Sequence, residues 1–199
     1  MAKLYFRYGT VGSAKTLNLL AVAHNYQQQN KRIALFKPSL DVRFGQDLIR
    51  SRSGLEKQAD LLLKSESVIP AHVAEGCQCI LVDEAQFLSA FVIEQLRRIA
   101  TDLNVPVICY GLRTDFRGKL FEGSKRLLEL SDSVEEVKTT CAFCNRKAMF
   151  NLKLQGGLPT LGGPNIDLGA EEKYLPACST CYKGKLSNIA PEGAYWPGS

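Results

Sequence analysis

Short apolar runs typical of β-strands alternate along most of the chain with segments of helical periodicity. The predicted strands cover residues 3–8, 32–37, 79–82 and 105–110, and the predicted helices cover residues 15–29 and 89–102. Alternation of this kind predicts parallel strands joined by crossover helices. We therefore expect an α/β protein in which helices pack on a parallel sheet.

The four segments that carry chemical groups each follow one of the predicted strands. They read GTVGSAKT, KPSLDVRFG, DEAQF and GLRTDFRG in chain order. Ligands of such sheets bind at the carboxyl ends of the strands. The sequence thus predicts one binding site that gathers all four segments.

Composition limits the classes of function. The chain has 199 residues, of which 45% are hydrophobic, enough for one main domain with a smaller appendage. The formal net charge of +5 is spread along the chain, so it does not require a nucleic acid or a membrane surface as a partner. There is no apolar run of membrane-spanning length and no signal-peptide core at the N-terminus. We expect a cytoplasmic protein.

The segment after the first strand is similar to a Walker A phosphate loop, G-x-x-x-x-G-K-[ST]. In such a loop, backbone N–H groups and the positive end of the following helix bind phosphate, and the lysine adds a charge. We expect Lys15 to reach the β- and γ-phosphates and the Thr16 hydroxyl to bind Mg²⁺. The alternative is an ordinary turn between a strand and a helix. The candidate phosphate-binding residues are Gly9, Thr10, Val11, Gly12, Ser13, Ala14, Lys15 and Thr16.

Ala14 stands where the Walker A pattern has its second glycine. If the loop requires a left-handed backbone at this position, alanine costs roughly 1–2 kcal/mol that glycine does not. The methyl group could also push on an incoming phosphate, or the loop could re-form around Gly12. The sequence leaves these three outcomes open.

The third strand ends in an acidic pair, Asp83 and Glu84, as a Walker B strand does. Carboxylates at the end of a buried strand must be hydrated, paired or bound to a metal ion. We expect Asp83 to hold Mg²⁺ through water and Glu84 to face the reacting oxygen. The alternative is that Asp83 caps a helix.

Four of the seven cysteines form two C-x-x-C pairs, Cys141 with Cys144 and Cys178 with Cys181. Two such pairs predict a tetrahedral zinc site, which would be structural because no position is open for water. Disulfides are the weaker alternative in a reducing compartment. The remaining cysteines lie in or beside apolar runs and are expected to be small buried hydrophobes. They are Cys77, Cys79 and Cys109.

These motifs, in this order and at similar spacings, resemble the type II thymidine kinases, the zinc-containing cellular and bacterial family. The resemblance covers residues 3–185 and rests on the phosphate loop, KPSLDVRF, DEAQF, GLRTDFRGKLF and the paired cysteines with GG and KY between them. It implies a RecA-like P-loop parallel sheet with flanking helices and a small C-terminal zinc-stabilised lasso domain. The expected domains are 1–138 for nucleotide binding and 139–187 for the lasso, with 188–199 as a flexible tail.

The resemblance also implies roles for individual residues. Lys15 and Thr16 match the residues that bind the phosphates and magnesium, Asp83 matches the magnesium carboxylate, and Glu84 matches the general base. Arg43 matches an arginine close to the phosphates. The nucleoside pocket of the family corresponds to Val11, Phe87, Leu112, Phe116, Phe121 and Tyr174.

Three features depart from the family pattern. Besides Ala14, Val11 replaces a methionine near the thymine methyl group, and GGPNIDLGAEEKY is longer than the usual GG…KY segment. The last two affect the base pocket and therefore the choice of nucleoside.

The leading hypothesis is an ATP-dependent thymidine kinase that uses Mg²⁺ and a structural Zn²⁺. Family likeness implies a homotetramer and feedback by dTTP. An alternative is a weak or inactive paralogue that binds nucleotide or nucleoside as a sensor or partner subunit, because of Ala14. A third, a P-loop protein whose zinc module binds nucleic acid, lacks a basic stripe and a row of exposed aromatic residues.

Overall fold

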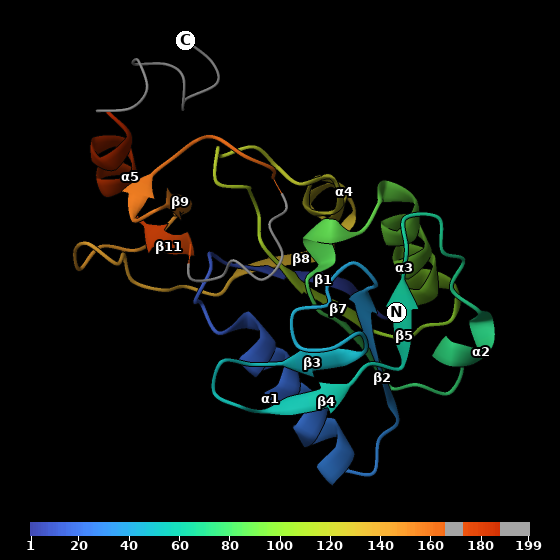
Figure 1. The fold of residues 1–199 in the computed structure, drawn as a ribbon. Helices are drawn as coiled ribbons and strands as arrows, with labels where there is room; N and C mark the ends of the chain where they lie inside the picture. The colour runs from blue at the N-terminus through green and yellow to red at the C-terminus, as the bar shows by residue number, and fades with distance from the viewer. Residues whose placement is uncertain (166–172, 188–199) are drawn as a thin grey trace.

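The computed structural model describes residues 1–165 and 173–187 and is built around a six-stranded sheet with helices on both faces (Figure 1). The strand order is β5-β2-β6-β7-β1-β8, and every pairing is parallel. This arrangement confirms the expected α/β fold. The strands are β1 (Leu4–Tyr8), β2 (Ile33–Pro38), β5 (Leu61–Leu63), β6 (Cys79–Val82), β7 (Val107–Gly111) and β8 (Ser133–Glu136).

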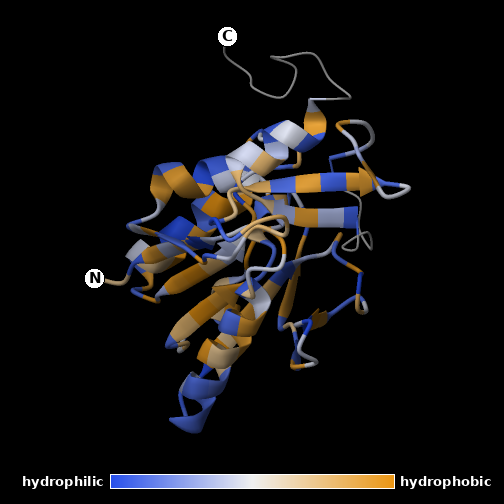
Figure 2. Ribbon diagram, turned by 90° about the vertical axis from the view of Figure 1, so that its left-hand side faces the viewer, coloured by the Kyte–Doolittle hydropathy of each residue, from blue (hydrophilic) through white to orange (hydrophobic). Residues whose placement is uncertain are grey.

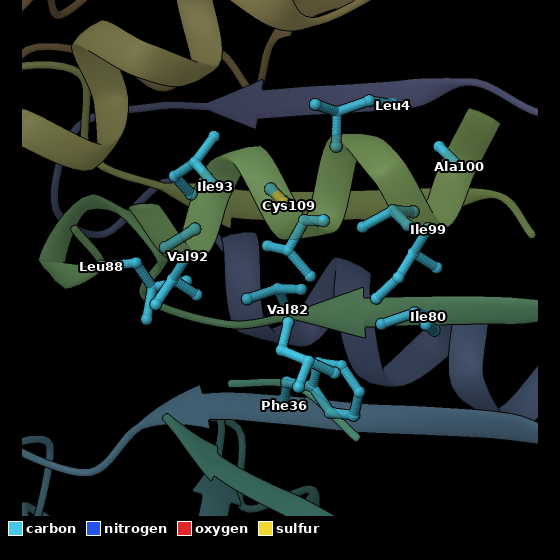
Figure 3. Packing of buried hydrophobic residues seen from close by; sticks show 14 of the residues in the cluster. Leu4, Phe36, Ile80, Val82, Leu88, Val92, Ile93, Ile99, Ala100 and Cys109 are labelled. Atoms are coloured by element: carbon cyan, nitrogen blue, oxygen red, sulfur yellow. The ribbon is translucent and has the colours of Figure 1, made fainter. Parts of the chain in front are cut away.

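Both faces of the central strands are buried, which explains their continuous apolar runs. In β6, Ile80 and Val82 join the hydrophobic cluster that contains residues of α3 (Ala90–Asp102). Leu81 joins the cluster on the other face, with residues of α1 (Lys15–Gln28). Figure 3 shows α3 lying over the strands and running along them, with apolar side chains between the helix and the sheet. In Figure 2 the central strands are mostly hydrophobic, whereas the helices carry both classes of residue.

Shorter elements surround this sheet. A 3-10 helix, η1 (Ala85–Phe87), follows β6, and α4 (Glu122–Leu130) packs on η1 and α3. The chain also forms a two-stranded hairpin, β3 (Leu48–Arg50) and β4 (Glu56–Gln58), and a short helix, α2 (Ala71–Ala74). Of these elements, the hairpin and η1 border the sheet edge where the candidate site lies.

A second, antiparallel sheet has the order β10-β9-β11 and carries its own small hydrophobic core. In that core the ring of Tyr182 stacks on Phe150 at a centroid distance of 4.8 Å. We call the described residues of 139–187 the C-terminal module. Its elements are β9 (Phe150–Gln155), β10 (Leu158–Pro159), β11 (Tyr174–Ala177) and α5 (Ser179–Leu186).

The strands and helices predicted from the sequence lie within two residues of the observed elements. The predicted burial of Cys77, Cys79 and Cys109 is also confirmed. The predicted tail at 188–199 and much of the longer GGPNIDLGAEEKY segment lie outside the described residues. Within the described ranges, no helix is long and apolar enough to cross a membrane.

Candidate active site

The segments that follow β1, β2, β6 and β7 line a common cavity of 320 Å³. The cavity therefore brings together the four segments that the sequence analysis placed at one sheet edge. Three of the candidate residues, Gly9, Thr10 and Asp83, do not line its wall. Those that do are Val11, Gly12, Ser13, Ala14, Lys15, Thr16, Arg43, Glu84, Phe87, Leu112, Phe116, Phe121 and Tyr174.

The loop after β1 has a left-handed backbone at Ala14, the conformation in which alanine is strained and glycine is not. Ala14 immediately precedes α1 and has φ 61° and ψ 28°, and Gly12 has φ 73°. An L-residue in this conformation is strained by roughly 1–2 kcal/mol. The loop has thus kept this geometry with alanine in place. The first-turn N–H groups of α1 lack helical acceptors and, with the helix dipole, favour an anion at this end of the cavity.

The Lys15 side chain folds back over the loop that precedes it. Its Nζ donates to the carbonyl oxygen of Thr10 at 2.7 Å and to Ser13 Oγ at 3.3 Å. The side chain is buried, with 9% of its surface exposed. A positive charge is therefore held inside the loop, at the wall of the cavity.

Thr16 and Asp83 bring two oxygen ligands together across the start of α1 and the end of β6. Thr16 Oγ1 donates to Asp83 Oδ2 at 3.1 Å. A hydroxyl oxygen can bind Mg²⁺ while its hydrogen is donated, so this hydrogen bond is compatible with Thr16 as a ligand and with the expectation that Asp83 acts through water. Asp83 does not cap the following helix, because its carboxylate bonds Thr16 instead and η1 has no side-chain cap.

The protonation of Asp83 and Glu84 is set by burial and by their neighbours. Burial, and then the charge of Glu84, raises the pKa of Asp83 to about 7. Burial also opposes ionisation of Glu84, but the charges of Arg43 and Lys15 outweigh it and hold the pKa of Glu84 below its ordinary value. Glu84 is therefore the ionised member of the pair, and a divalent cation beside Asp83 would favour ionisation of Asp83 as well.

The Glu84 carboxylate is held by two neighbours. Its Oε1 lies 2.7 Å from Nη2 of Arg43, and its Oε2 accepts a hydrogen bond from Gln86 Nε2. Its backbone is left-handed, with φ 48°. Among the described residues, positive φ outside glycine occurs at Ala14, Glu84 and two asparagines. Asparagine tolerates this conformation, so the two residues with a strained backbone, Ala14 and Glu84, both lie at this site.

Asp41 fixes the orientation of Arg43. Arg43 Nε lies 2.7 Å from Asp41 Oδ1, and Lys37 Nζ lies 3.6 Å from the other carboxylate oxygen. Burial raises the pKa of Asp41, but the Arg43 guanidinium and the Lys37 charge more than compensate, so the net pKa is lowered. The family resemblance implies that Arg43 lies near the phosphates. The structure pairs it with Asp41 and Glu84 at the cavity wall.

The 3-10 helix η1, which follows Glu84 in the chain, packs directly against α4. Gln86, which is 2% exposed, accepts a hydrogen bond from the backbone N–H of Leu112 at 2.9 Å. Gly123 lies so close to η1 that a Cβ there would be 2.5 Å from the carbonyl oxygen of Ala85. Gln86 therefore links Glu84 to the segment after β7. The helix that carries Gln86 packs so closely on α4 that position 123 has no room for a side chain.

Aromatic rings form the apolar part of the cavity. Phe87 and Phe121 meet edge to face at 5.6 Å between ring centroids, and Phe116 lies 6.2 Å from Tyr174. Tyr174 begins β11, so the C-terminal module contributes one side of this aromatic group. The module also contacts the backbone of Phe116, because the Tyr182 hydroxyl donates a hydrogen bond to the Phe116 carbonyl oxygen.

The cavity is also lined by residues that the sequence analysis did not name. Arg50 to Ser53 belong to the turn of the β3–β4 hairpin, which the SRSG sequence between two short runs could have indicated. Asn151 lies on β9, where FNLKLQ alternates with the period of a strand. The full set is Leu17, Phe44, Arg50, Ser51, Arg52, Ser53, Asp115, Asn151 and Asn165.

The four paired cysteines converge in the C-terminal module. Their Sγ atoms all lie within 4.8 Å of one another, and the Sγ of Cys144 is 3.6 Å from that of Cys178 and 3.7 Å from that of Cys181. Tetrahedral Zn–S bonds of 2.3 Å imply S···S distances of about 3.8 Å. All four are free thiols rather than disulfides. The cluster therefore fits a four-coordinate thiolate metal site.

Comparison with known proteins supports the same family. The thymidine kinase family model matches residues 2–182. The chain is 41% identical over 184 residues to the thymidine kinase of Streptococcus pyogenes, covering 92% of this chain and 97% of that protein. It is 42% identical to the thymidine kinase of Streptococcus gordonii (92% and 96% coverage) and 44% identical to that of Listeria innocua (92% and 97%), each over 185 residues. The chain belongs to the thymidine kinase family.

Proposed function

We propose that the protein transfers the γ-phosphate of ATP to the 5′-hydroxyl of thymidine and releases dTMP and ADP. One observation carries this proposal: a single cavity is lined by the phosphate loop, by an ionised carboxylate and by a group of aromatic rings. Family membership agrees with it. The phosphate donor would occupy the loop end of the cavity and the nucleoside the aromatic end.

At the loop end, the segment 9–16 would hold the phosphates, with the backbone N–H groups that are not engaged within the protein among the donors. Lys15 would add its charge to the β- and γ-phosphates, as expected from the Walker A pattern. Thr16 and Asp83 would hold Mg²⁺, which neutralises charge on the phosphates when bound. Arg43, which lines the cavity, would lie beside the transferred group.

The proposed chemical step uses Glu84 as the base. Its carboxylate accepts the proton of the 5′-hydroxyl, the oxygen forms a bond to the γ-phosphorus, and the bond to the bridging oxygen of ADP breaks. Because the pKa of Glu84 is held below its ordinary value, the base is ready in its ionised form at neutral pH. Most of the rate enhancement would come from positioning and charge stabilisation.

At the aromatic end, the base and sugar would be enclosed by apolar side chains. Tyr174 would pack on the pyrimidine, and Val11 would lie near its methyl group. The remaining members of the proposed pocket are Phe87, Leu112, Phe116 and Phe121. Family resemblance further leads us to propose a cytoplasmic homotetramer inhibited by dTTP, with a nucleotide-binding domain at 1–138 and a lasso domain at 139–187.

The direct test is a phosphoryl-transfer assay with thymidine, ATP and Mg²⁺ that detects dTMP and ADP together. We expect equal amounts of both products, and neither when Mg²⁺ is chelated. Deoxycytidine serves as the matched control acceptor. ADP formation without dTMP, or faster phosphorylation of deoxycytidine, would contradict the proposal.

We propose that the cysteine cluster holds one structural Zn²⁺ per chain, as its sulfur geometry supports. Metal analysis of the purified protein should find one equivalent. The Cys144→Ser variant is expected to raise the thymidine KM more than the ATP KM, because the cluster lies in the module that carries Tyr174. A protein without zinc, with these cysteines joined in disulfides, would refute the assignment.

Ala14→Gly is expected to stabilise the fold more than it improves nucleotide binding. The left-handed backbone is present without a ligand, so relief of roughly 1–2 kcal/mol of strain acts on free and bound protein alike. Glycine loses about 0.5–1 kcal/mol through its greater freedom in the unfolded chain, which leaves a net gain of up to about 1.5 kcal/mol. Denaturant unfolding measures this gain, and calorimetry should find the ATP Kd within about threefold of the parent value.

A different result would change the interpretation of this loop. If the parent protein failed to bind ATP while Ala14→Gly bound it well, the alanine methyl group would be blocking the phosphate site. The chain would then be a disabled member of its family. Gly12→Ala is the companion variant, because Gly12 has φ 73° with no atom near its missing Cβ, so it tests backbone strain without a steric clash.

A further inference from the structure

Asn151 joins two loops of the main sheet from its position on β9. Its Oδ1 accepts the backbone N–H of Val11 at 2.9 Å, and its Nδ2 donates to the carbonyl oxygen of Thr114 at 3.1 Å. The side chain is 4% exposed. Val11 belongs to the loop after β1 and Thr114 to the segment after β7, and these two strands are neighbours in the sheet. One buried carboxamide therefore spans both loops from a separate sheet.

Both loops contribute to the lining of the cavity. Val11 leads into the phosphate loop, whereas Thr114 precedes Phe116 of the aromatic group. The C-terminal module fastens this second loop twice, through Asn151 and through the Tyr182 hydroxyl on the Phe116 carbonyl oxygen. The distance between the phosphate loop and the aromatic group is thus set by a residue of the module as well as by the main sheet.

The hydrogen bonds of Asn151 within the protein leave it little capacity to bind a substrate directly. Its carboxamide oxygen and one of its N–H groups are engaged by backbone atoms. The Val11 N–H is already engaged by Asn151, so a phosphate in the loop would rely on other N–H groups. The role of Asn151 is therefore exerted through the two loops.

We propose that Asn151 is a positioning residue for the phosphoryl transfer proposed above, on which this inference rests. By fixing the phosphate loop against the segment that carries Phe116, it sets how closely the nucleoside 5′-oxygen approaches the γ-phosphorus. Displacements on the scale of an ångström lower transfer rates strongly even when both substrates remain bound. Loss of Asn151 should therefore reduce kcat rather than substrate affinity.

The test compares two variants with the parent holoenzyme. Asn151→Leu is similar in size but can neither accept nor donate, and Asn151→Asp keeps the acceptor for the Val11 N–H. We expect kcat to fall about tenfold in Asn151→Leu, with the KM values for ATP and thymidine within about threefold, and to fall less in Asn151→Asp. Hydrogen exchange at residues 9–16 should be faster in Asn151→Leu and nearly unchanged in Asn151→Asp.

Arg146→Ala is the control, because it removes an exposed hydrogen bond to Thr180 within the same module and should alter neither kcat nor exchange. The inference is overturned if exchange at residues 9–16 is unchanged in Asn151→Leu, or if the loss appears in the thymidine KM at constant kcat. Failure of the parent to phosphorylate thymidine would instead overturn the proposed function. Hydrogen exchange would still decide whether Asn151 holds the loop.

Discussion

Replacing Glu84 with glutamine is expected to lower kcat by roughly 10²–10⁴-fold, the usual contribution of a positioned general base. Glutamine keeps the shape of the side chain and can still accept a hydrogen bond from Arg43, but it cannot take the proton of the 5′-hydroxyl. The KM values for both substrates should change little. Steady-state kinetics with thymidine and ATP measure the effect.

Glu94→Gln is the matched control for this substitution. Glu94 lies on α3 and pairs with Arg126 at 2.8 Å, on the surface and away from the cavity. The same loss of one carboxylate charge there should leave kcat unchanged. If Glu84→Gln kept its kcat while thymidine binding collapsed, Glu84 would be a binding residue and the base would have to be sought elsewhere.

Lys15→Met is expected to reduce kcat/KM for ATP by roughly 10²–10³-fold, a loss comparable to removing one preorganised donor from a developing charge. Methionine retains an unbranched apolar stem but carries no charge. Thymidine affinity should be nearly unaffected, because Lys15 is the first residue of α1 and the aromatic group comes from other segments. Calorimetry with each substrate separates the two effects.

The buried position of Lys15 supplies the control for that experiment. Its Nζ bonds the Thr10 carbonyl oxygen, so loss of the side chain could also disturb the loop itself. Lys15→Arg keeps the charge with a different shape and should retain more ATP binding than Lys15→Met. Equal loss of ATP and thymidine binding in Lys15→Met would indicate that the loop had collapsed.

The sequence was sufficient for the central strands because they are buried on both faces. Their apolar runs at 33–38, 79–82 and 107–111 leave little choice of structure. The edge strand β8 reads SVEE and has no such run, since none of its residues is buried. The hairpin strands β3 and β4 have three residues each, too few to show a period. These elements depend on contacts made after the chain has folded.

The candidate site divides in the same way. The phosphate loop, the acidic pair and the cysteine pairs are local patterns, so their positions could be read directly. The pairing of Arg43 with Glu84 spans 41 residues and the bridge from Asn151 to Val11 spans 140, so neither leaves a local pattern. The left-handed backbone at Glu84 also had no local signal, because glutamate does not favour that conformation.

Gly123 shows how packing alone can constrain a position remote from the substrates. A Cβ at this position would lie 2.5 Å from the Ala85 carbonyl oxygen and 2.6 Å from that of Leu88, closer than real side chains come. Any substitution must push α4 away from η1, and η1 carries the glutamine that orients Glu84. A change in the choice of nucleoside would alter the aromatic wall of the cavity but would still require glycine at 123, because this position makes room for the backbone of η1 and not for a substrate.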